Sequence, residues 1–225
     1  HVTMDYSLKN KRILVTAGPT REWIDPVRYI TNHSSGKMGY ALADQALLRG
    51  CSVTLISGPS EERALPGINT ISVNTAEEMY REVKNRVTEA DILFMAAAVA
   101  DFRPKTPFSD KIRKDQSVLS NLEMERTRDI LKSISSAAPS CLKIGFALES
   151  GGGETAARKK LADKKLDMIC LNRLGRDQEG FQSETNRLTL ISGADKEELP
   201  LIHKQEAAAR IVEKAADLLN KKDAV

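Results

Sequence analysis

Short apolar runs alternate along this chain with longer segments in which apolar residues recur at helical spacing. The apolar runs predict strands over residues 12–16, 52–57, 69–73, 91–97, 141–147, 166–171 and 188–192. The segments with helical spacing predict helices over residues 36–49, 75–88, 129–137, 154–165 and 203–221. Repeated β–α units with buried strands predict a doubly wound, Rossmann-like α/β fold with a mostly parallel sheet. In such a fold, ligands bind along the edge where the strands end.

The segment 102–121 breaks this alternation. It is long and basic, contains Pro104 and Pro107, and directly follows the most apolar strand-like run. Loops of this length inside a compact domain are usually functional or disordered. We therefore expect a flexible flap that leaves the sheet at this point.

Glycine marks a second irregular point. Gly151, Gly152 and Gly153 predict a hinge before the Lys-rich helix. No linker divides the chain, so we expect one domain over residues 10–222. We interpret residues 1–9 as the remnant of a tag or linker.

Composition narrows the possible function classes. Hydrophobic residues make up 41% and charged residues 29%, as in ordinary soluble globular proteins. The net charge of +3 does not mark a nucleic-acid binder, because the segment Asp101–Lys114 alone holds five Lys or Arg and two Asp. No run approaches the roughly 18 apolar residues that span a membrane. We expect neither nucleic acid nor a membrane among the partners.

The three cysteines lie in or beside apolar runs. Cys51, Cys141 and Cys170 show no paired spacing, which argues against a metal knuckle or a disulfide framework. A cytoplasmic location is therefore the default expectation.

The stretch Asn32–Gly39 lies between a predicted strand and a predicted helix. Its glycines and hydroxyls allow backbone N–H groups to approach an anion, and a helix N-terminus adds positive potential. A dinucleotide fingerprint needs Gly-x-Gly-x-x-Gly directly after the strand, and this chain lacks that pattern. A P-loop needs a glycine at position 31 and a Ser or Thr at position 38, where this chain has Thr31 and Met38. The stretch therefore matches neither motif. We interpret the stretch as a site for a phosphorylated or carboxylated small molecule, with a surface loop and helix cap as the alternative.

Polar residues gather where the predicted strands end. Asp101 follows the central strand, and small residues before it allow a base or sugar to lie against the backbone. Phe146 ends another strand, where an aromatic ring can stack on a base. Lys160 and Lys164 lie four residues apart on one face of the next helix. Several cations at one sheet edge suit a polyphosphate ligand, although such lysines are often surface residues and such a phenylalanine often belongs to the core.

Residues 25–39, Asp-Pro-Val-Arg-Tyr-Ile-Thr-Asn-His-Ser-Ser-Gly-Lys-Met-Gly, resemble the signature of phosphopantothenate–cysteine ligases (phosphopantothenoylcysteine synthetases), enzymes of coenzyme A biosynthesis. The similarity continues through four further motifs, at residues 96–101, 110–114, 145–147 and 167–172. It departs at Thr127-Arg128-Asp129, where many relatives have Asn-Pro-Asp. In bacteria this domain often follows a flavin-dependent decarboxylase, which this sequence lacks, so FMN is not implied.

The resemblance implies a reaction and roles for individual residues. The family activates the carboxylate of 4′-phosphopantothenate with a nucleotide, commonly CTP in bacteria, and the amine of L-cysteine then attacks the acyl-cytidylate. By resemblance, Asn32 polarises the acyl group, Arg28 is a second active-site residue, and Lys111 belongs to the flap that closes on the intermediate. The resemblance also implies a homodimer, and Mg²⁺ that bridges the phosphates.

A larger set of positions is expected to contact the ligands. The positions expected to bind the nucleotide are Met95, Ala96, Ala97, Asp101, Lys111, Glu125, Arg126, Thr127, Arg128, Phe146, Lys160 and Lys164. The loop expected to bind a substrate phosphate comprises Ser34, Ser35, Gly36 and Lys37. Two other function classes stay open, an NAD(P)-binding oxidoreductase and a non-catalytic nucleotide-binding regulator. The absent glycine fingerprint argues against the first of these.

Overall fold

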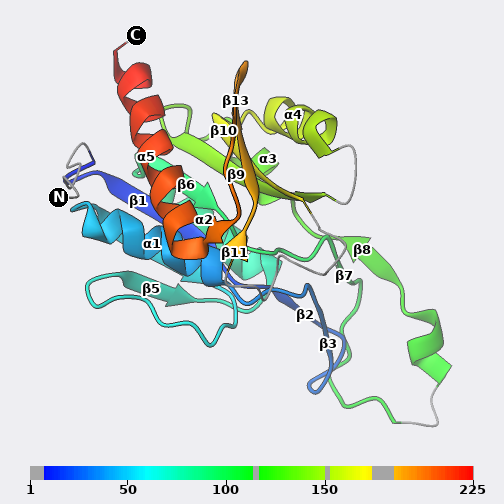
Figure 1. Ribbon diagram of the computed structural model, residues 1–225. Coiled ribbons are helices and arrows are strands. Elements are labelled where there is room, and N and C mark those ends of the chain that lie inside the picture. Colours follow the sequence, from blue (N-terminus) through cyan, green and yellow to red (C-terminus); the bar gives the residue numbers. More distant parts are fainter. Residues whose placement is uncertain (1–7, 114–116, 150–152, 174–184, 225) are drawn as a thin grey trace.

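An eight-stranded sheet forms the centre of the molecule (Figure 1). The structure is a computed structural model that describes residues 8–113, 117–149, 153–173 and 185–224. The strands of the sheet are β1 (Arg12–Ala17), β4 (Ser52–Ser57), β5 (Asn69–Ser72), β6 (Ile92–Met95), β9 (Leu142–Glu149), β10 (Met168–Arg173), β12 (Leu188–Ser192) and β13 (Asp195–Glu198). They lie side by side in the order β13-β12-β10-β9-β6-β1-β4-β5.

Most of this sheet is parallel. The six strands β10, β9, β6, β1, β4 and β5 run in one direction. At one edge, β12 pairs antiparallel with β10, and β13 pairs antiparallel with β12. Val15 of β1 lies between Leu55 of β4 and Phe94 of β6. The chain passes from β1 to one side of the sheet and later returns on the other side at β6. Strand order reverses there, and the crevice beyond such strand ends is where doubly wound folds bind ligands.

Helices cover both faces of the sheet. Helices α1 (Lys37–Leu48) and α5 (Lys204–Asp223) pack on one face, whereas α2 (Ala76–Arg86), α3 (Ile130–Ile134) and α4 (Gly153–Asp163) pack on the other (Figure 1). The predicted doubly wound α/β fold is therefore confirmed.

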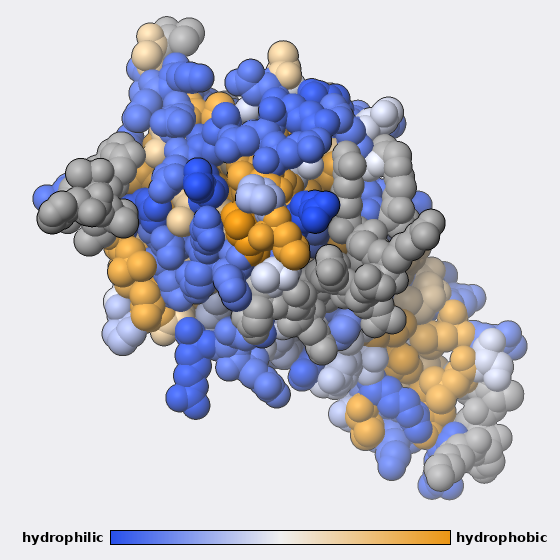
Figure 2. Space-filling model, viewed as in Figure 1, coloured by the Kyte–Doolittle hydropathy of each residue, from blue (hydrophilic) through white to orange (hydrophobic). Residues whose placement is uncertain are grey.

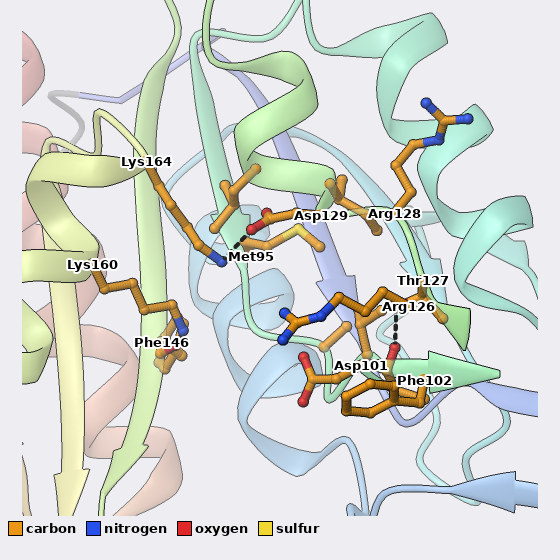
Figure 3. Close-up of a pocket in the computed structure, with 15 residues that line it drawn as sticks. Met95, Asp101, Phe102, Arg126, Thr127, Arg128, Asp129, Phe146, Lys160 and Lys164 are labelled. Carbon is orange, nitrogen blue, oxygen red and sulfur yellow. Dashed lines mark hydrogen bonds and ion pairs between the residues drawn. The ribbon is translucent and has the colours of Figure 1, made fainter. Parts of the chain in front are cut away.

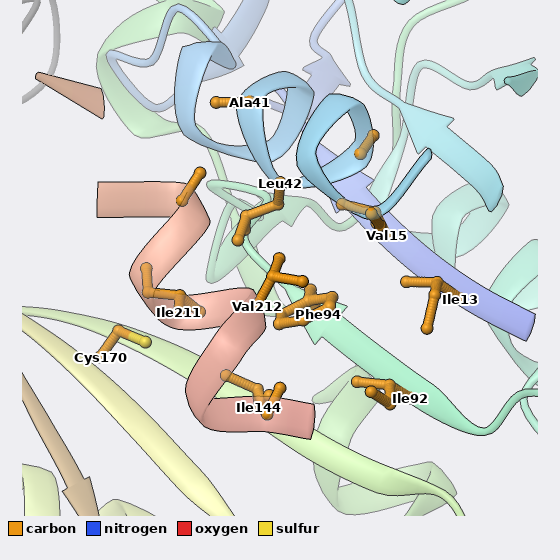
Figure 4. Packing of buried hydrophobic residues seen from close by; sticks show 14 of the residues in the cluster. Ile13, Val15, Ala41, Leu42, Ile92, Phe94, Ile144, Cys170, Ile211 and Val212 are labelled. Atoms are coloured by element: carbon orange, nitrogen blue, oxygen red, sulfur yellow. The ribbon is translucent and has the colours of Figure 1, made fainter. Parts of the chain in front are cut away.

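Aliphatic side chains fill the layer between the sheet and the helices α1 and α5. Leu42 of α1 and Val212 of α5 meet Phe94 of β6, and all three are fully buried (Figure 4). Burying a side chain of this size contributes roughly 1.5–3 kcal/mol. This packing fixes the two helices against the strands whose ends form the site.

Close packing of α1 on β1 depends on Gly39. A Cβ atom at this position would lie 2.4 Å from the Cβ of Ala17 and 3.0 Å from the carbonyl oxygen of Thr16. Only glycine allows this approach without movement of the helix. The contact sets the position of the start of α1, and therefore of the preceding loop, relative to the sheet.

Two arms extend from the same end of the sheet (Figure 1). In the first arm, residues 21–31, β2 (Arg21–Trp23) pairs with β3 (Tyr29–Thr31). In the second arm, residues 102–126, β7 (Phe102–Pro104) pairs with β8 (Met124–Arg126) on either side of the short 3₁₀ helix η1 (Ser117–Asn121). The second arm contains the segment in which we predicted a flap.

Asp25 joins the two arms. Its fully buried carboxylate accepts hydrogen bonds from the backbone N–H groups of Val27 (2.8 Å) and Arg28 (2.7 Å) in the first arm and of Ile112 (3.1 Å) in the second. The Arg28 guanidinium lies 2.7 Å from the same carboxylate. Burial raises the pKa of Asp25, but these donors outweigh that effect, and the pKa lies below its ordinary value. The carboxylate therefore stays charged and holds the arms together.

Several sequence expectations need correction. Leu8, which we assigned to a tag or linker, is 1% exposed and belongs to the core, so the folded chain begins before residue 10. The helix predicted over 129–137 ends as an α-helix at Ile134. Gly153 is the first residue of α4, and the rest of the predicted glycine hinge, like Lys114, lies outside the described residues.

The cysteines are free and buried. Desolvation raises the pKa of the Cys51 and Cys141 thiols to about 11 and raises that of Cys170 as well. Within the described part of the chain, every helix is too short or too polar to cross a membrane.

Candidate functional site

Two adjoining cavities lie beyond the ends of β6 and β9. The first has a volume of about 430 Å³ (Figure 3). It is lined by Met95, Ala97, Val99, Ala100, Asp101, Phe102, Arg126, Thr127, Arg128, Asp129, Ile130, Leu131, Phe146, Lys160 and Lys164. Most positions predicted to bind a nucleotide therefore come together in one place.

Two lysines of α4 supply positive charge to the first cavity. Lys160 is partly buried, and its Nζ donates a hydrogen bond to the backbone oxygen of Phe146 at 2.6 Å. Burial lowers the pKa of Lys160, and the ammonium of Lys164 lowers it further. Lys164 lies 3.0 Å from the carboxylate of Asp129 across the cavity (Figure 3). An anionic ligand here meets Lys160, which is already partly desolvated, and Lys164, which is paired with Asp129.

The loop Thr127–Asp129 forms the opposite wall and is held in place by the end of the central strand. The Thr127 hydroxyl donates to the Ala100 oxygen at 2.5 Å, and the Thr127 N–H donates to the Asp101 oxygen at 3.0 Å (Figure 3). Asp129 caps α3 by accepting the Lys132 N–H at 3.1 Å. Burial raises the pKa of Asp129, but this N–H and the Lys164 ammonium outweigh it, so the pKa lies below its ordinary value.

The second cavity, of about 380 Å³, lies against the start of α1. Asn32, Ser34, Ser35, Gly36 and Lys37 all line it. Gly36 adopts a left-handed conformation (φ +85°) as the residue before the helix, and the first helical N–H, that of Lys37, donates to Ser35 Oγ at 3.4 Å. The positive dipole end of α1 therefore lies at this cavity, where it favours an anionic ligand.

Asn32 lines the second cavity and is held beside Val99, which lines both cavities. Its Nδ2 donates to the backbone oxygen of Val99 at 3.0 Å, although the residue is exposed. Ala97, Asp101 and Lys160 line both cavities. A reacting group between the cavities would therefore lie near the Asn32 amide.

Some predicted residues lie outside both cavities. The Arg28 guanidinium contacts Asp25 and donates to the Ile112 oxygen at 3.3 Å, so it holds the second arm. Lys111 is exposed on that arm, next to Ile112. Glu125 pairs with Arg103 at 2.8 Å on the second arm and does not line a cavity. Ala96 lines the second cavity, although we grouped it with the nucleotide-binding positions of the first.

Three polar residues of the second cavity were given no role from the sequence, although one of them, Asn172, lies in the motif at residues 167–172. They are Asn172 at the end of β10, Asn186 in β11 (Thr185–Asn186) and Lys204 at the start of α5. Asn172 closes a parallel strand, and the same rule that found Asp101 applies to it. Asn186 and Lys204 reach the cavity through pairing of β11 with β14 (Ile202–His203), for which the sequence carries no signal.

Asp101 is the exposed carboxylate at the junction of the cavities. Within the described residues there is no group of three or more His, Cys, Asp or Glu side chains that could form a closed metal site. A magnesium ion that accompanies a nucleotide needs less, because Mg²⁺ is commonly held by one or two carboxylates together with substrate phosphates and water. Asp101 fits that requirement.

These features define a doubly wound α/β domain with a basic crevice at its topological switch point. The chain belongs to the family described as the DNA/pantothenate metabolism flavoprotein C-terminal domain, whose model matches residues 8–219. The coenzyme A biosynthesis bifunctional protein CoaBC of Vibrio vulnificus is 44% identical over 94% of this chain, and that of Bacillus subtilis is 42% identical over 94%. The chain spans about half the length of these relatives, 53% and 52%.

A solved structure agrees with this assignment. The crystal structure of the C-terminal domain of a CoaBC protein superposes with a TM-score of 0.83 at 38% identity, over 96% of this chain and 100% of that one. The resemblance inferred from the sequence motifs is therefore confirmed at the level of the family.

Proposed function

We propose that this chain is a phosphopantothenate–cysteine ligase that joins 4′-phosphopantothenate to L-cysteine in coenzyme A biosynthesis. The observation that supports this proposal is a pair of adjoining cavities in a member of this family. One cavity is basic and large enough for a nucleotide, and the other lies at the start of α1. Two anionic reactants have to be brought together before a third attacks. Cavities that share Ala97, Asp101 and Lys160 suit that requirement.

The proposed reaction has two steps. A carboxylate oxygen of phosphopantothenate attacks the α-phosphorus of the nucleotide, the bond from that phosphorus to the β-phosphate oxygen breaks, and pyrophosphate leaves. The cysteine amine then attacks the acyl carbon, the acyl carbon–oxygen bond breaks, the nucleoside monophosphate leaves, and the amine loses a proton. Nucleotidyl transfer is needed because a free carboxylate is a poor electrophile.

Fixed donors near the cavity junction support both steps. Asn32 is held by Val99, so its amide is oriented before substrate arrives, which is how electrostatic preorganisation lowers a barrier. Lys111 is proposed to reach the phosphates when the second arm moves toward the cavities. Arg28 is proposed to act indirectly. Its hydrogen bond to the Ile112 oxygen fixes the backbone next to Lys111 and so helps to position Lys111.

We propose CTP as the nucleotide. Phe146 offers a ring for stacking in the first cavity, and the backbone of Thr127–Asp129 offers hydrogen-bonding groups for the edge of a base. A site that hydrogen-bonds one base rejects another strongly, because mispairing leaves buried polar groups unsatisfied. Mg²⁺ held by Asp101 would neutralise phosphate charge when bound.

Pyrophosphate release tests the activity and the nucleotide together. The protein is incubated with phosphopantothenate, L-cysteine and Mg²⁺, with CTP or ATP at equal concentration. We expect pyrophosphate and the ligated product with CTP, and little with ATP. Better turnover with ATP would overturn the choice of nucleotide but not the ligase activity. Nucleotide binding without pyrophosphate release would instead indicate a non-catalytic regulator. NAD(P) binding without either would favour an oxidoreductase.

We propose that two copies associate through the arms. Large apolar side chains are exposed on both arms, namely Val27, Tyr29, Phe102, Phe108, Leu119 and Met124. Figure 2 shows apolar residues gathered at the surface of the second arm, at the lower right. Such a patch on a small domain marks an interaction surface. Light scattering should give twice the mass of the chain, and Phe102→Lys should give the monomer mass.

We expect this reaction in the cytoplasm. The buried thiols of Cys51, Cys141 and Cys170 are typical of proteins in a reducing compartment. Fractionation of cells that contain the protein tests this expectation, and recovery with the membranes would contradict it.

A further inference from the structure

One wall of the second cavity is polar, buried and not used by the mechanism above. Asn172, Asn186 and Lys204 form it, and Asn186 and Lys204 are only 6% and 5% exposed. Antiparallel pairing of Asn186 with Ile202 brings β11 next to the first residue of α5 (Figure 1). The wall is therefore built from three separate elements at the ends of β10, β11 and β14.

Asn186 carries an unpaired acceptor. Its Oδ1 atom is buried, and no described residue donates a hydrogen bond to it. Buried side-chain oxygens are nearly always paired in folded proteins, so each exception needs an explanation. This oxygen requires an N–H or O–H donor. A fully ionised phosphate has no such donor and cannot satisfy it.

Lys204 adds a cation to the same wall. It is the first residue of α5, where the positive end of the helix dipole disfavours an ammonium group. The helix dipole gives no reason for a buried lysine at this position, so its presence in the cavity wall points to another role. The wall thus presents one acceptor and one cation to the same cavity, together with apolar contacts from Met38, Leu148 and Leu188.

We propose that this wall binds the amino-acid substrate, an inference that rests on the proposed ligase function. The amine of L-cysteine donates to Asn186 Oδ1, its carboxylate faces Lys204, and its short thiol side chain contacts the apolar residues. The first cavity is lined by Arg126, Arg128, Lys160 and Lys164, which suit a polyphosphate, so the nucleotide does not need this wall. The amine then enters from the second cavity toward the acyl carbon beside Asn32.

The two half-reactions separate this role from nucleotide binding. Asn186→Leu removes the acceptor at similar volume, Asn186→Asp keeps an acceptor, and Asn220→Leu changes an exposed asparagine as a matched control. Without cysteine, the pyrophosphate burst reports the first step. With cysteine, steady-state kinetics give the KM for each substrate.

We expect Asn186→Leu to raise the KM for L-cysteine at least about tenfold, as loss of one buried hydrogen bond implies. Its burst and its KM for CTP should match those of the wild type, and Asn186→Asp and Asn220→Leu should keep a KM for cysteine close to normal. A lost burst, a raised KM for CTP or an unchanged KM for cysteine in folded Asn186→Leu would overturn the assignment. No pyrophosphate from the wild-type protein would instead refute the ligase itself.

Cysteamine, which keeps the amine and thiol but lacks the carboxylate, tests Lys204 separately. The wild-type protein should prefer L-cysteine to cysteamine, and Lys204→Met should abolish most of that preference while its pyrophosphate burst remains. An undiminished preference in the folded variant would contradict the proposed contact. This comparison also keeps the proposal testable if Asn186→Leu does not fold.

Discussion

Gly39→Ala tests whether the packing of α1 on β1 controls the site. The new Cβ would lie 2.4 Å from the Cβ of Ala17, whereas carbon atoms in contact sit about 3.5–4.0 Å apart. The helix start must therefore move by roughly 1 Å, because the opposing atoms belong to a strand in the middle of the sheet. Overpacking of this kind costs about 1–3 kcal/mol, which the higher helix propensity of alanine offsets by about 1 kcal/mol.

The consequence should be larger for catalysis than for stability. A net loss of up to about 2 kcal/mol lowers the Tm by a few degrees in a chain of this size, roughly 2–4 °C per kcal/mol. A misplacement of about 1 Å at the loop Ser34–Lys37 can reduce kcat/KM by roughly a hundredfold. Pyrophosphate release and thermal unfolding measure the two effects, with the exposed helix residue Leu48→Ala as the control. A folded Gly39→Ala protein with normal kcat/KM would refute this reasoning.

Three other predictions concern individual side chains. Burial and the Lys164 charge lower the pKa of Lys160, so nucleotide affinity should fall as the pH rises through a range below 10.5. Lys160→Arg should shift that fall to higher pH, as measured by titration calorimetry. An affinity that does not depend on pH would argue against Lys160 as a phosphate ligand. Lys111→Gln should impair turnover but leave the Tm unchanged, since the residue is exposed, and equal turnover would remove it from the mechanism. Asn32→Asp should abolish most ligation by placing a negative charge beside anionic substrates, and near-normal product formation would exclude that role.

Much of the fold could be predicted because the central strands are apolar on both faces. Ile92–Met95 is continuously buried, and so is most of Arg12–Ala17, which is the pattern a parallel sheet between helices imposes. The edge strand Asp195–Glu198 could not be predicted, because all four of its residues are charged and exposed. Charged edge strands protect a sheet from further pairing and carry no apolar signal. The three-residue strands of the arms are too short to show a period.

The site was predictable where the sheet edge alone determines position. Asp101 and Lys160 follow parallel strands and Phe146 lies in the last part of β9, so the topology brings them together. Arg28 and Lys111 belong to motifs that give residue type and spacing, but their positions depend on how the arms pack. Asn186 and Lys204 were missed because pairing between two short strands brings them to the cavity, and that contact is decided by the tertiary structure.

Following the carboxylate oxygen through the reaction tests the ligase mechanism most directly. Phosphopantothenate is labelled with a heavy oxygen isotope in its carboxylate and allowed to react with CTP, Mg²⁺ and L-cysteine, and the products are analysed by mass spectrometry. If an acyl-cytidylate forms, one labelled oxygen remains on phosphorus when the amine displaces it, so the released CMP carries one heavy oxygen and the pyrophosphate carries none. CMP without the label, or label in the pyrophosphate or in inorganic phosphate, would contradict the proposed mechanism.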